Sequence, residues 1–212
     1  MNRLSDLKPQ LKGVLFDFDG TLLDSFAIHY EAYRVMFSRF DIHVSEEQFT
    51  HCYSPDWYHT YRAVGLPEET WELANTYWLE EAAKHVATLF PEVPDVLTEL
   101  SHRYALGIVT SGSRNRVMRD LERTAIKQHF QSVVTGNDVK EPKPAPDGLE
   151  IALRQLKLQA HEVVYVGDAF ADYEMAQAAN VSFVGVASAF TRSGAELPFE
   201  QVSSIKSLIA LF

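Results

Sequence analysis

Cysteine is almost absent from this chain of 212 residues, which has a single one, Cys52. One cysteine cannot form an internal disulfide, and no cysteine and histidine spacing typical of a zinc site is present. The fold must therefore depend on the burial of apolar side chains. With 46% hydrophobic residues, the chain has enough of them for a sizeable core.

Long apolar runs and an excess of basic residues are also missing. No segment approaches the roughly 18 to 20 apolar residues that cross a bilayer, and the first residues carry charges and a proline where a secretory signal needs an apolar segment. The 19 basic and 29 acidic residues give a net charge of −10, which disfavours nucleic acid as a partner. These features predict a cytoplasmic protein without membrane or nucleic-acid partners, either a monomer or a weak dimer.

Short apolar segments alternate with helical patterns along most of the chain. One apolar run ends at Phe16, and four segments of strand length follow, at 105–109, 132–135, 163–166 and 181–186. Between them apolar residues recur at helical spacing. This alternation indicates βαβ units, so the sequence predicts an α/β fold whose parallel sheet has helices on both faces.

Residues 25–91 interrupt this pattern, because they contain several helical stretches and no convincing strand. The expected helices cover 26–40, 56–64 and 67–90. We therefore predict a core formed by 1–24 and 92–212, with an all-helical cap, 25–91, inserted after the first strand. The dense aromatic residues of this segment are expected mainly to pack its helices, with one or two lining a pocket.

Two carboxylates follow the first strand, in the run Asp17-Phe18-Asp19-Gly20-Thr21. Because side chains alternate along an extended chain, residues two apart can face the same small volume. Two like charges held that close need a cation or a shared proton. A strand-to-turn junction would explain the Asp-Gly pair alone, but not the second acid and the threonine with it.

Polar residues also stand where the next three strands end. They are Thr110, Ser111 and Gly112 after the second strand, Lys143 between two prolines after the third, and Asp168 and Asp172 after the fourth. Each has an ordinary alternative explanation, as a helix cap, a solvated lysine or an acid in the first turn of a helix. Ligands of open parallel sheets bind at the carboxyl ends of the strands, so their joint placement predicts one site.

Taken together, these residues resemble the four motifs of the haloacid dehalogenase (HAD) superfamily. The resemblance covers residues 12–190 and is to the helical-cap subgroup, which includes phosphoglycolate phosphatases and β-phosphoglucomutases. It implies a Rossmann-like core, Mg²⁺ as cofactor and a small phosphorylated metabolite as substrate. The dehalogenase branch lacks the second acid of the first motif, so Asp19 favours phosphoryl transfer.

The resemblance implies a role for each motif residue. Asp17 would be the nucleophile that forms an aspartyl-phosphate, and Asp19 would be the general acid and then the base. Lys143 and Thr110 would hold the phosphoryl oxygens. The implied Mg²⁺ ligands are Asp17, Asp168, the main-chain carbonyl of Asp19, and Asp172 through water or as a supporting partner.

Other residues are candidates for contact with the substrate. They are Thr21, which would also order its loop, Ser111 and Gly112, whose turn opens a helix with free N–H groups, and Arg114 and Arg62. For Arg62, a solvated helix arginine is the alternative.

Two further functions remain open alongside a Mg²⁺-dependent phosphatase acting on a phosphomonoester. A phosphomutase would use the same aspartyl-phosphate but keep it until a sugar rebinds. A phospho-accepting signalling module also uses acids, Mg²⁺ and a lysine on a parallel sheet, although such modules have no helical cap of this size. Rapid release of phosphate from many esters would count against the phosphomutase.

Overall fold

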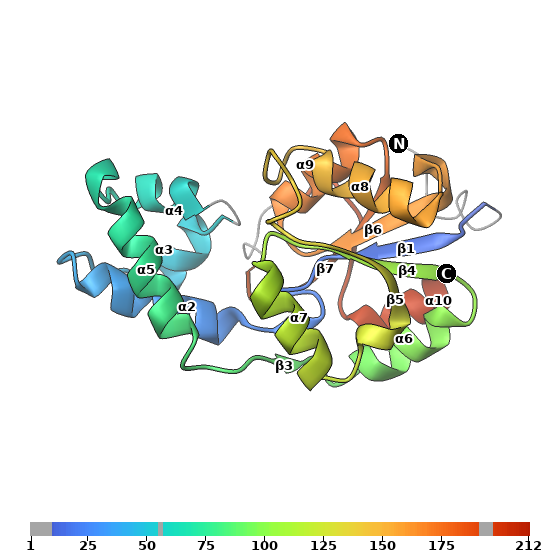
Figure 1. Ribbon diagram of the computed structural model, residues 1–212, viewed down its shortest axis with the longest axis horizontal. Coiled ribbons are helices and arrows are strands. Elements are labelled where there is room, and N and C mark those ends of the chain that lie inside the picture. Colours follow the sequence, from blue (N-terminus) through green and yellow to red (C-terminus); the bar gives the residue numbers. More distant parts are fainter. Residues whose placement is uncertain (1–9, 55–56, 191–196) are drawn as a thin grey trace.

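A parallel sheet forms the larger of two lobes in the computed structural model, which describes residues 10–54, 57–190 and 197–212 (Figure 1). Its six strands in this part of the chain are β1 Gly13–Phe16, β4 Ala105–Val109, β5 Phe130–Val134, β6 Val163–Gly167, β7 Ser182–Val186 and β8 Gln201–Val202. Their spatial order is β5-β4-β1-β6-β7-β8, and every neighbouring pair is parallel. The expected α/β fold with a parallel sheet is confirmed.

The first strand lies at the centre of the sheet. Phe16, its last residue, is in register with Ile108 of β4 and Val166 of β6. All four residues of β1 are buried, because helices cover both faces of the sheet, and this explains its continuous apolar run. The carboxyl ends of three adjacent strands therefore meet directly beyond Phe16.

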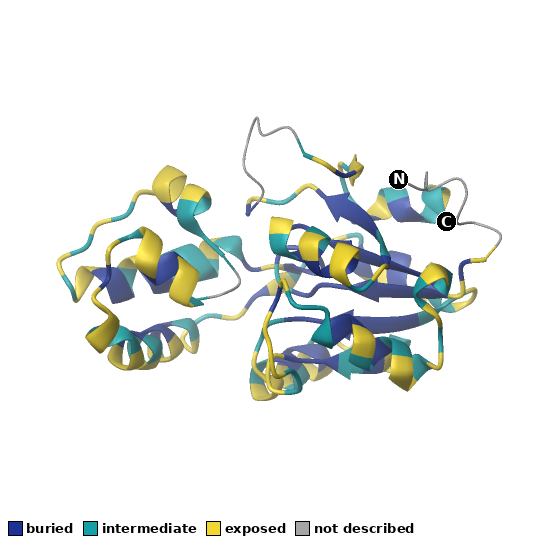
Figure 2. Ribbon diagram, turned by 90° about the horizontal axis from the view of Figure 1, so that it is seen from above, coloured by how far each residue is buried: buried dark blue, intermediate teal, exposed yellow. Residues whose placement is uncertain are grey.

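Helices lie on both sides of the sheet (Figure 1). On one face are α8 Asp147–Leu156 and α9 Phe170–Ala178, and on the other are α6 Val93–Ser101, α7 Arg114–Arg123 and the short α10 Leu208–Leu211. Figure 2 shows that the strands between these layers are buried and that exposed residues gather on the outer sides of the helices. No helix in the described ranges is both long enough and apolar enough to span a membrane.

The second lobe is a cap of four helices with a core of its own. Its helices are α2 Phe26–Ser38, α3 Glu46–Cys52, α4 Trp57–Ala63 and α5 Trp71–Ala82. Their buried side chains are mainly aromatic or large, and include Tyr33, Met36, Phe37, Phe49, Tyr61 and Trp78. The chain leaves the core through β2 Leu23–Asp24 and returns through β3 Thr88–Leu89, which pairs with β2 antiparallel. The all-helical cap inserted after β1 is therefore confirmed.

Several elements differ from the sequence prediction. The expected helix over 67–90 is wrong at both ends, because a 3₁₀ turn, Glu68–Thr70, precedes α5, and α5 ends at Ala82 before β3. Strands β2, β3 and β8 have two residues each, which is too short for any periodic pattern, and helix α3 was not expected. The expected helix over 56–64 corresponds to α4, and residue 56 lies outside the described residues.

Candidate active site

The two acids of the first motif lie directly beyond β1, in a tight loop. The amide of Asp17 donates to the carbonyl of Val166 at 2.8 Å and so continues the sheet pairing by one residue. Gly20 has φ of 77°, in the left-handed region, and a Cβ atom there would lie 2.4 Å from Oδ2 of Asp168. Only glycine meets both requirements, so the sequence of this loop is set by its close approach to the end of β6.

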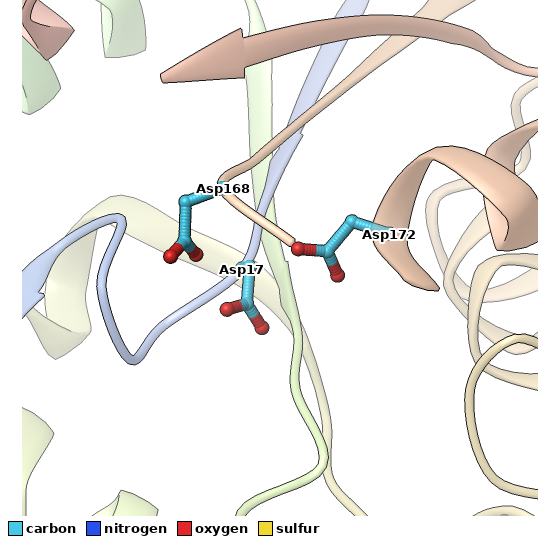
Figure 3. Close-up of side chains that lie close together, drawn as sticks. All are labelled: Asp17, Asp168 and Asp172. Carbon is cyan, nitrogen blue, oxygen red and sulfur yellow. The ribbon is translucent and has the colours of Figure 1, made fainter. Parts of the chain in front are cut away.

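Three carboxylates meet at this edge of the sheet. Asp17 comes from the end of β1, Asp168 from the end of β6, and Asp172 from the first turn of α9 (Figure 3). Each offers an oxygen within 4.8 Å of the others, and all three residues are buried. The structure thus brings together three of the four residues that were predicted to bind a metal.

Lys143 lies among these carboxylates and is buried with them. Its Nζ donates to Oδ1 of Asp17 at 2.6 Å, to Oδ1 of Asp172 at 2.7 Å and to the hydroxyl of Tyr165 at 2.8 Å. All three protons of the ammonium group therefore have partners. Burial opposes the charge of Lys143, but the carboxylates outweigh it and raise the pKa above its usual range. The lysine remains protonated.

The net negative charge of these three carboxylates and Lys143 favours a bound cation. Three carboxylates share one ammonium, and burial raises the pKa of Asp17 above its usual range although Lys143 acts in the opposite direction. Burial also raises the pKa of Asp168, and the charge of Asp17 adds to that effect. A buried, oxygen-only donor set with surplus negative charge fits a hard divalent cation such as Mg²⁺.

Hydroxyl groups orient Asp168. Thr21 donates to Oδ1 at 3.1 Å and Ser188, in the loop after β7, donates to Oδ2 at 2.5 Å. Thr21 is fully buried and does not line the cavity, and its hydroxyl links the loop after β1 to Asp168. Ser188 was missed by sequence reasoning because it follows the last long strand without a motif.

Asp19 has partners different from those of the other acids. Arg116, on α7, donates from Nη1 to Oδ1 at 3.0 Å and from Nη2 to Oδ2, and His29, on α2 of the cap, has Nε2 3.5 Å from Oδ1. Burial would raise the pKa of Asp19, but Arg116 and His29 outweigh it and hold the pKa below its usual range. The Asp19 side chain is therefore outside the three-carboxylate group. The predicted metal contact through its main-chain carbonyl stays a prediction.

A cavity of about 440 Å³ lies between the cap and the ends of the strands. Core residues around it include Asp17, Asp19, Thr110, Ser111, Gly112, Arg116, Arg119, Lys143 and Asp168. The cap contributes His29, Tyr53, Trp57, Trp78, Leu79, Ala82 and Ala83. Phe190 of the core closes one side, with ring centroids 4.7 Å from Tyr53 and 5.0 Å from Phe26. Three aromatic residues of the cap, Tyr53, Trp57 and Trp78, thus line this cavity, one more than the one or two that were expected.

Besides Thr21, two predicted substrate contacts, both arginines, lie away from this cavity. Arg62 stacks over Trp71 in the cap and lies 3.6 Å from Glu68, which agrees with the alternative of a solvated helix arginine. Arg114 is paired with Asp138, and its amide donates to Asn137 at 2.8 Å. The first turn of α7 is therefore partly engaged within the protein. Arg116, two residues later, faces the cavity instead.

Similarity to known proteins agrees with this geometry. The sequence model of the haloacid dehalogenase-like hydrolases matches residues 14–186, which is most of the chain. The chain belongs to this family. The HAD resemblance expected from the four motifs is confirmed, and the protein is a HAD-type hydrolase.

Individual HAD relatives cover most of the chain. Pyrophosphatase PpaX of Bacillus pumilus is 32% identical over 178 residues, which is 82% of each protein. A haloacid dehalogenase-like hydrolase structure from Bacteroides fragilis has 26% identity and a TM-score of 0.85, covering 93% of this chain and 99% of that one. A structure from Lactobacillus plantarum, of a protein provisionally described as a phosphoglycolate phosphatase, has 21% identity and a TM-score of 0.85. It covers 96% of this chain and 100% of that one.

Proposed function

We propose that this HAD protein is a Mg²⁺-dependent phosphatase that hydrolyses a small phosphomonoester through an aspartyl-phosphate on Asp17. The observation that carries the proposal is the position of Asp17, which lies 2.6 Å from the ammonium of Lys143 and faces a cavity covered by the cap. A carboxylate attacking a phosphate ester needs positive charge beside it, since both reactants are anions. Lys143 supplies part of that charge.

Each residue of the site has its own role around the phosphorus atom in this proposal. Asp17 attacks it and becomes phosphorylated, which splits one difficult step into two easier ones. Lys143 and Thr110 hold the phosphoryl oxygens, and both border the cavity. Asp19 gives a proton to the leaving oxygen and later takes one from the attacking water. The cap excludes other water from the site.

Asp17, Asp168 and Asp172 would hold the Mg²⁺ ion. Bound there, the ion would neutralise charge on the phosphoryl oxygens. Thr21 and Ser188 keep Asp168 in place for this task by donating to its two oxygens. Substrates in this proposal include esters and also pyrophosphate, because a relative with 32% identity is named a pyrophosphatase.

The test is phosphate release from a panel of substrates in the presence of Mg²⁺. The panel contains sugar phosphates, phosphorylated carboxylic acids, pyrophosphate and 4-nitrophenyl phosphate. Asp17→Asn is the matched variant, because it removes the nucleophile with little change of volume. Multiple turnover by the wild type, lost in Asp17→Asn and in chelator, is the expected result.

Two outcomes would point elsewhere. A wild-type protein that becomes phosphorylated on Asp17 but releases phosphate slowly would favour the phosphomutase or the signalling module. Turnover that persists in Asp17→Asn would exclude the aspartyl-phosphate route. Turnover of pyrophosphate alone would keep the phosphatase and replace the monoester as its substrate.

A further inference from the structure

Arg116 occupies a position in the cavity that the proposed chemistry does not use. Its guanidinium donates to both carboxylate oxygens of Asp19, and its side chain is 21% exposed. Held by Arg116 through both oxygens, Asp19 acts as an acceptor and cannot donate a proton to a leaving group in this arrangement. Arg116 must therefore release at least one oxygen of Asp19 during turnover.

The place of Arg116 decides which part of a substrate it meets. Asp17 and Lys143, which are 2.6 Å apart, mark the phosphoryl end of the cavity in the proposed reaction. Asp19 must lie within hydrogen-bond reach of the leaving oxygen to act as an acid. A group that contacts Asp19 from the cavity therefore lies on the leaving-group side, beyond the scissile bond.

The surroundings of Arg116 carry surplus positive charge. Arg116, Arg119 and Arg123 all lie within 4 Å of the Asp120 carboxylate, and Arg116 also pairs with Asp19, so three guanidinium groups share two carboxylates. Arg119 lines the same cavity. Among the described residues that line it, the cap contributes no acidic side chain, only aromatic and aliphatic groups and His29. The leaving-group end of the cavity therefore suits an anion.

The absence of a side chain at Gly112 leaves space for the Arg116 guanidinium. A Cβ atom on Gly112 would lie 2.3 Å from Nη2 of Arg116 and 2.9 Å from Val117. The guanidinium therefore packs directly on the turn after β4, next to the phosphoryl end of the cavity. This close packing places the Arg116 guanidinium against the turn that follows β4, beside Asp19.

We propose that Arg116 is a specificity-determining residue that binds a second anionic group, a carboxylate or a phosphate, on the leaving-group side of the substrate. The anion replaces Asp19 as the partner of the guanidinium, and Asp19 is released toward the leaving oxygen. Arg119 adds positive charge at the same end of the cavity. The inference rests on the proposed phosphatase function and adds that the core helix α7 contributes to substrate selection.

The test compares matched probes with and without a second anion. 3-Phosphoglycerate carries a carboxylate where glycerol 3-phosphate carries a neutral alcohol, and pyrophosphate carries a phosphate as its leaving group. Both kcat and KM are measured for the wild type, Arg116→Met and Arg116→Lys with Mg²⁺. Arg154→Met is the control, since Arg154 is an exposed arginine of α8 with an ion partner on its own helix.

A charge-assisted contact predicts a loss of about 10- to 100-fold in kcat/KM for 3-phosphoglycerate and pyrophosphate in Arg116→Met, chiefly through KM. The KM for glycerol 3-phosphate should change by less than about threefold, because this probe lacks the second anion, and any change in its kcat reports the loss of the Arg116 contact with Asp19. Arg116→Lys should recover part of the preference, since it keeps the charge without the bidentate geometry. A response to only one of the two anionic probes identifies whether the site takes a carboxylate or a phosphate.

Calorimetric binding to Asp17→Asn, with and without Arg116→Met, separates this inference from the proposed function. Selective binding of the anionic probes that needs Arg116 supports the inference even if the wild type turns over none of them. An equal loss for anionic and neutral probes would overturn it, and so would a wild type without preference or without binding. Circular dichroism of each variant checks that it is folded.

Discussion

Replacing Tyr165 by phenylalanine is expected to destabilise the protein although it removes a single oxygen atom. Tyr165 is fully buried on β6. Its hydroxyl accepts from Lys143 at 2.8 Å, and it lies 2.9 Å from the carbonyl of Val109 and 3.0 Å from Oδ1 of Asp172. The one hydroxyl proton is donated to one of these two oxygens or shared between them.

The magnitude follows from the groups that Tyr165→Phe leaves behind. Lys143 loses one of three partners, and a hydrogen bond to a charged group contributes about 1.5–3 kcal/mol. The oxygen of Val109 or Asp172 that accepts the hydroxyl proton loses its donor, and a buried unsatisfied group costs about 1–3 kcal/mol. Because phenylalanine avoids the burial of a hydroxyl, part of this cost is offset. We expect the free energy of unfolding to fall by about 2–4 kcal/mol.

Urea denaturation, followed by fluorescence and circular dichroism, measures this change. Tyr173→Phe is the matched control, because Tyr173 packs against Phe183 and Phe199 on the same side of the sheet through its ring. That variant should stay within about 0.5 kcal/mol of the wild type. If Tyr165→Phe is equally mild, Lys143 does not depend on the tyrosine and the reasoning fails.

Three further predictions concern other parts of the molecule. Phe190→Ala removes ring contacts with Tyr53 and Phe26 of the cap, so kcat/KM should fall and the free energy of unfolding should fall by about 2–4 kcal/mol. Phe190→Leu should recover most of both quantities. Unchanged kinetics would show that this contact does not hold the cap. Burial would raise the pKa of Asp138, but hydrogen bonds from Thr135 outweigh it and leave the pKa below its usual range. Because the pKa is lowered in the folded state, the ionised carboxylate stabilises the fold above pH ~4, and this stability is lost as the pH falls through the folded pKa. The difference in free energy of unfolding between the wild type and Asp138→Asn, measured by urea denaturation, should therefore narrow below pH ~4. Mg²⁺ should raise the melting temperature of the wild type, by an amount corresponding to about 2.7 kcal/mol at a hundredfold excess over its Kd. The increase should be smaller in Asp168→Asn. An equal increase in both proteins would place the ion elsewhere.

The positions of the motif residues could be predicted because they depend on short-range patterns. Asp17 and Asp168 each follow a buried apolar strand, and parallel strands bring their carboxyl ends to one edge. Arg116 and Tyr165 could not be assigned in this way. Arg116 meets Asp19 across 97 positions of sequence, and a long helix arginine has the same local pattern whether it faces solvent or a cavity.

Tyr165 illustrates a second limit. It stands in the middle of a continuous apolar strand, where an aromatic residue is ordinarily a packing residue. Its hydroxyl matters only because Lys143 arrives from a loop 22 positions away. The signal that could have found it is chemical, since a buried tyrosine hydroxyl needs a partner.

The pairing of β2 with β3 has a consequence for how this enzyme could diversify. Leu23 and Leu89 are neighbours in that pair, so the cap begins and ends at adjacent points of the core. Because the two ends of the cap are adjacent, the chain pays an entropic cost for closing this insert as a loop. That cost grows only with the logarithm of the loop length, so a longer cap would add little to it. Caps of other sizes could therefore be exchanged at this junction, in evolution or by design, while the sheet and its carboxylates keep their places.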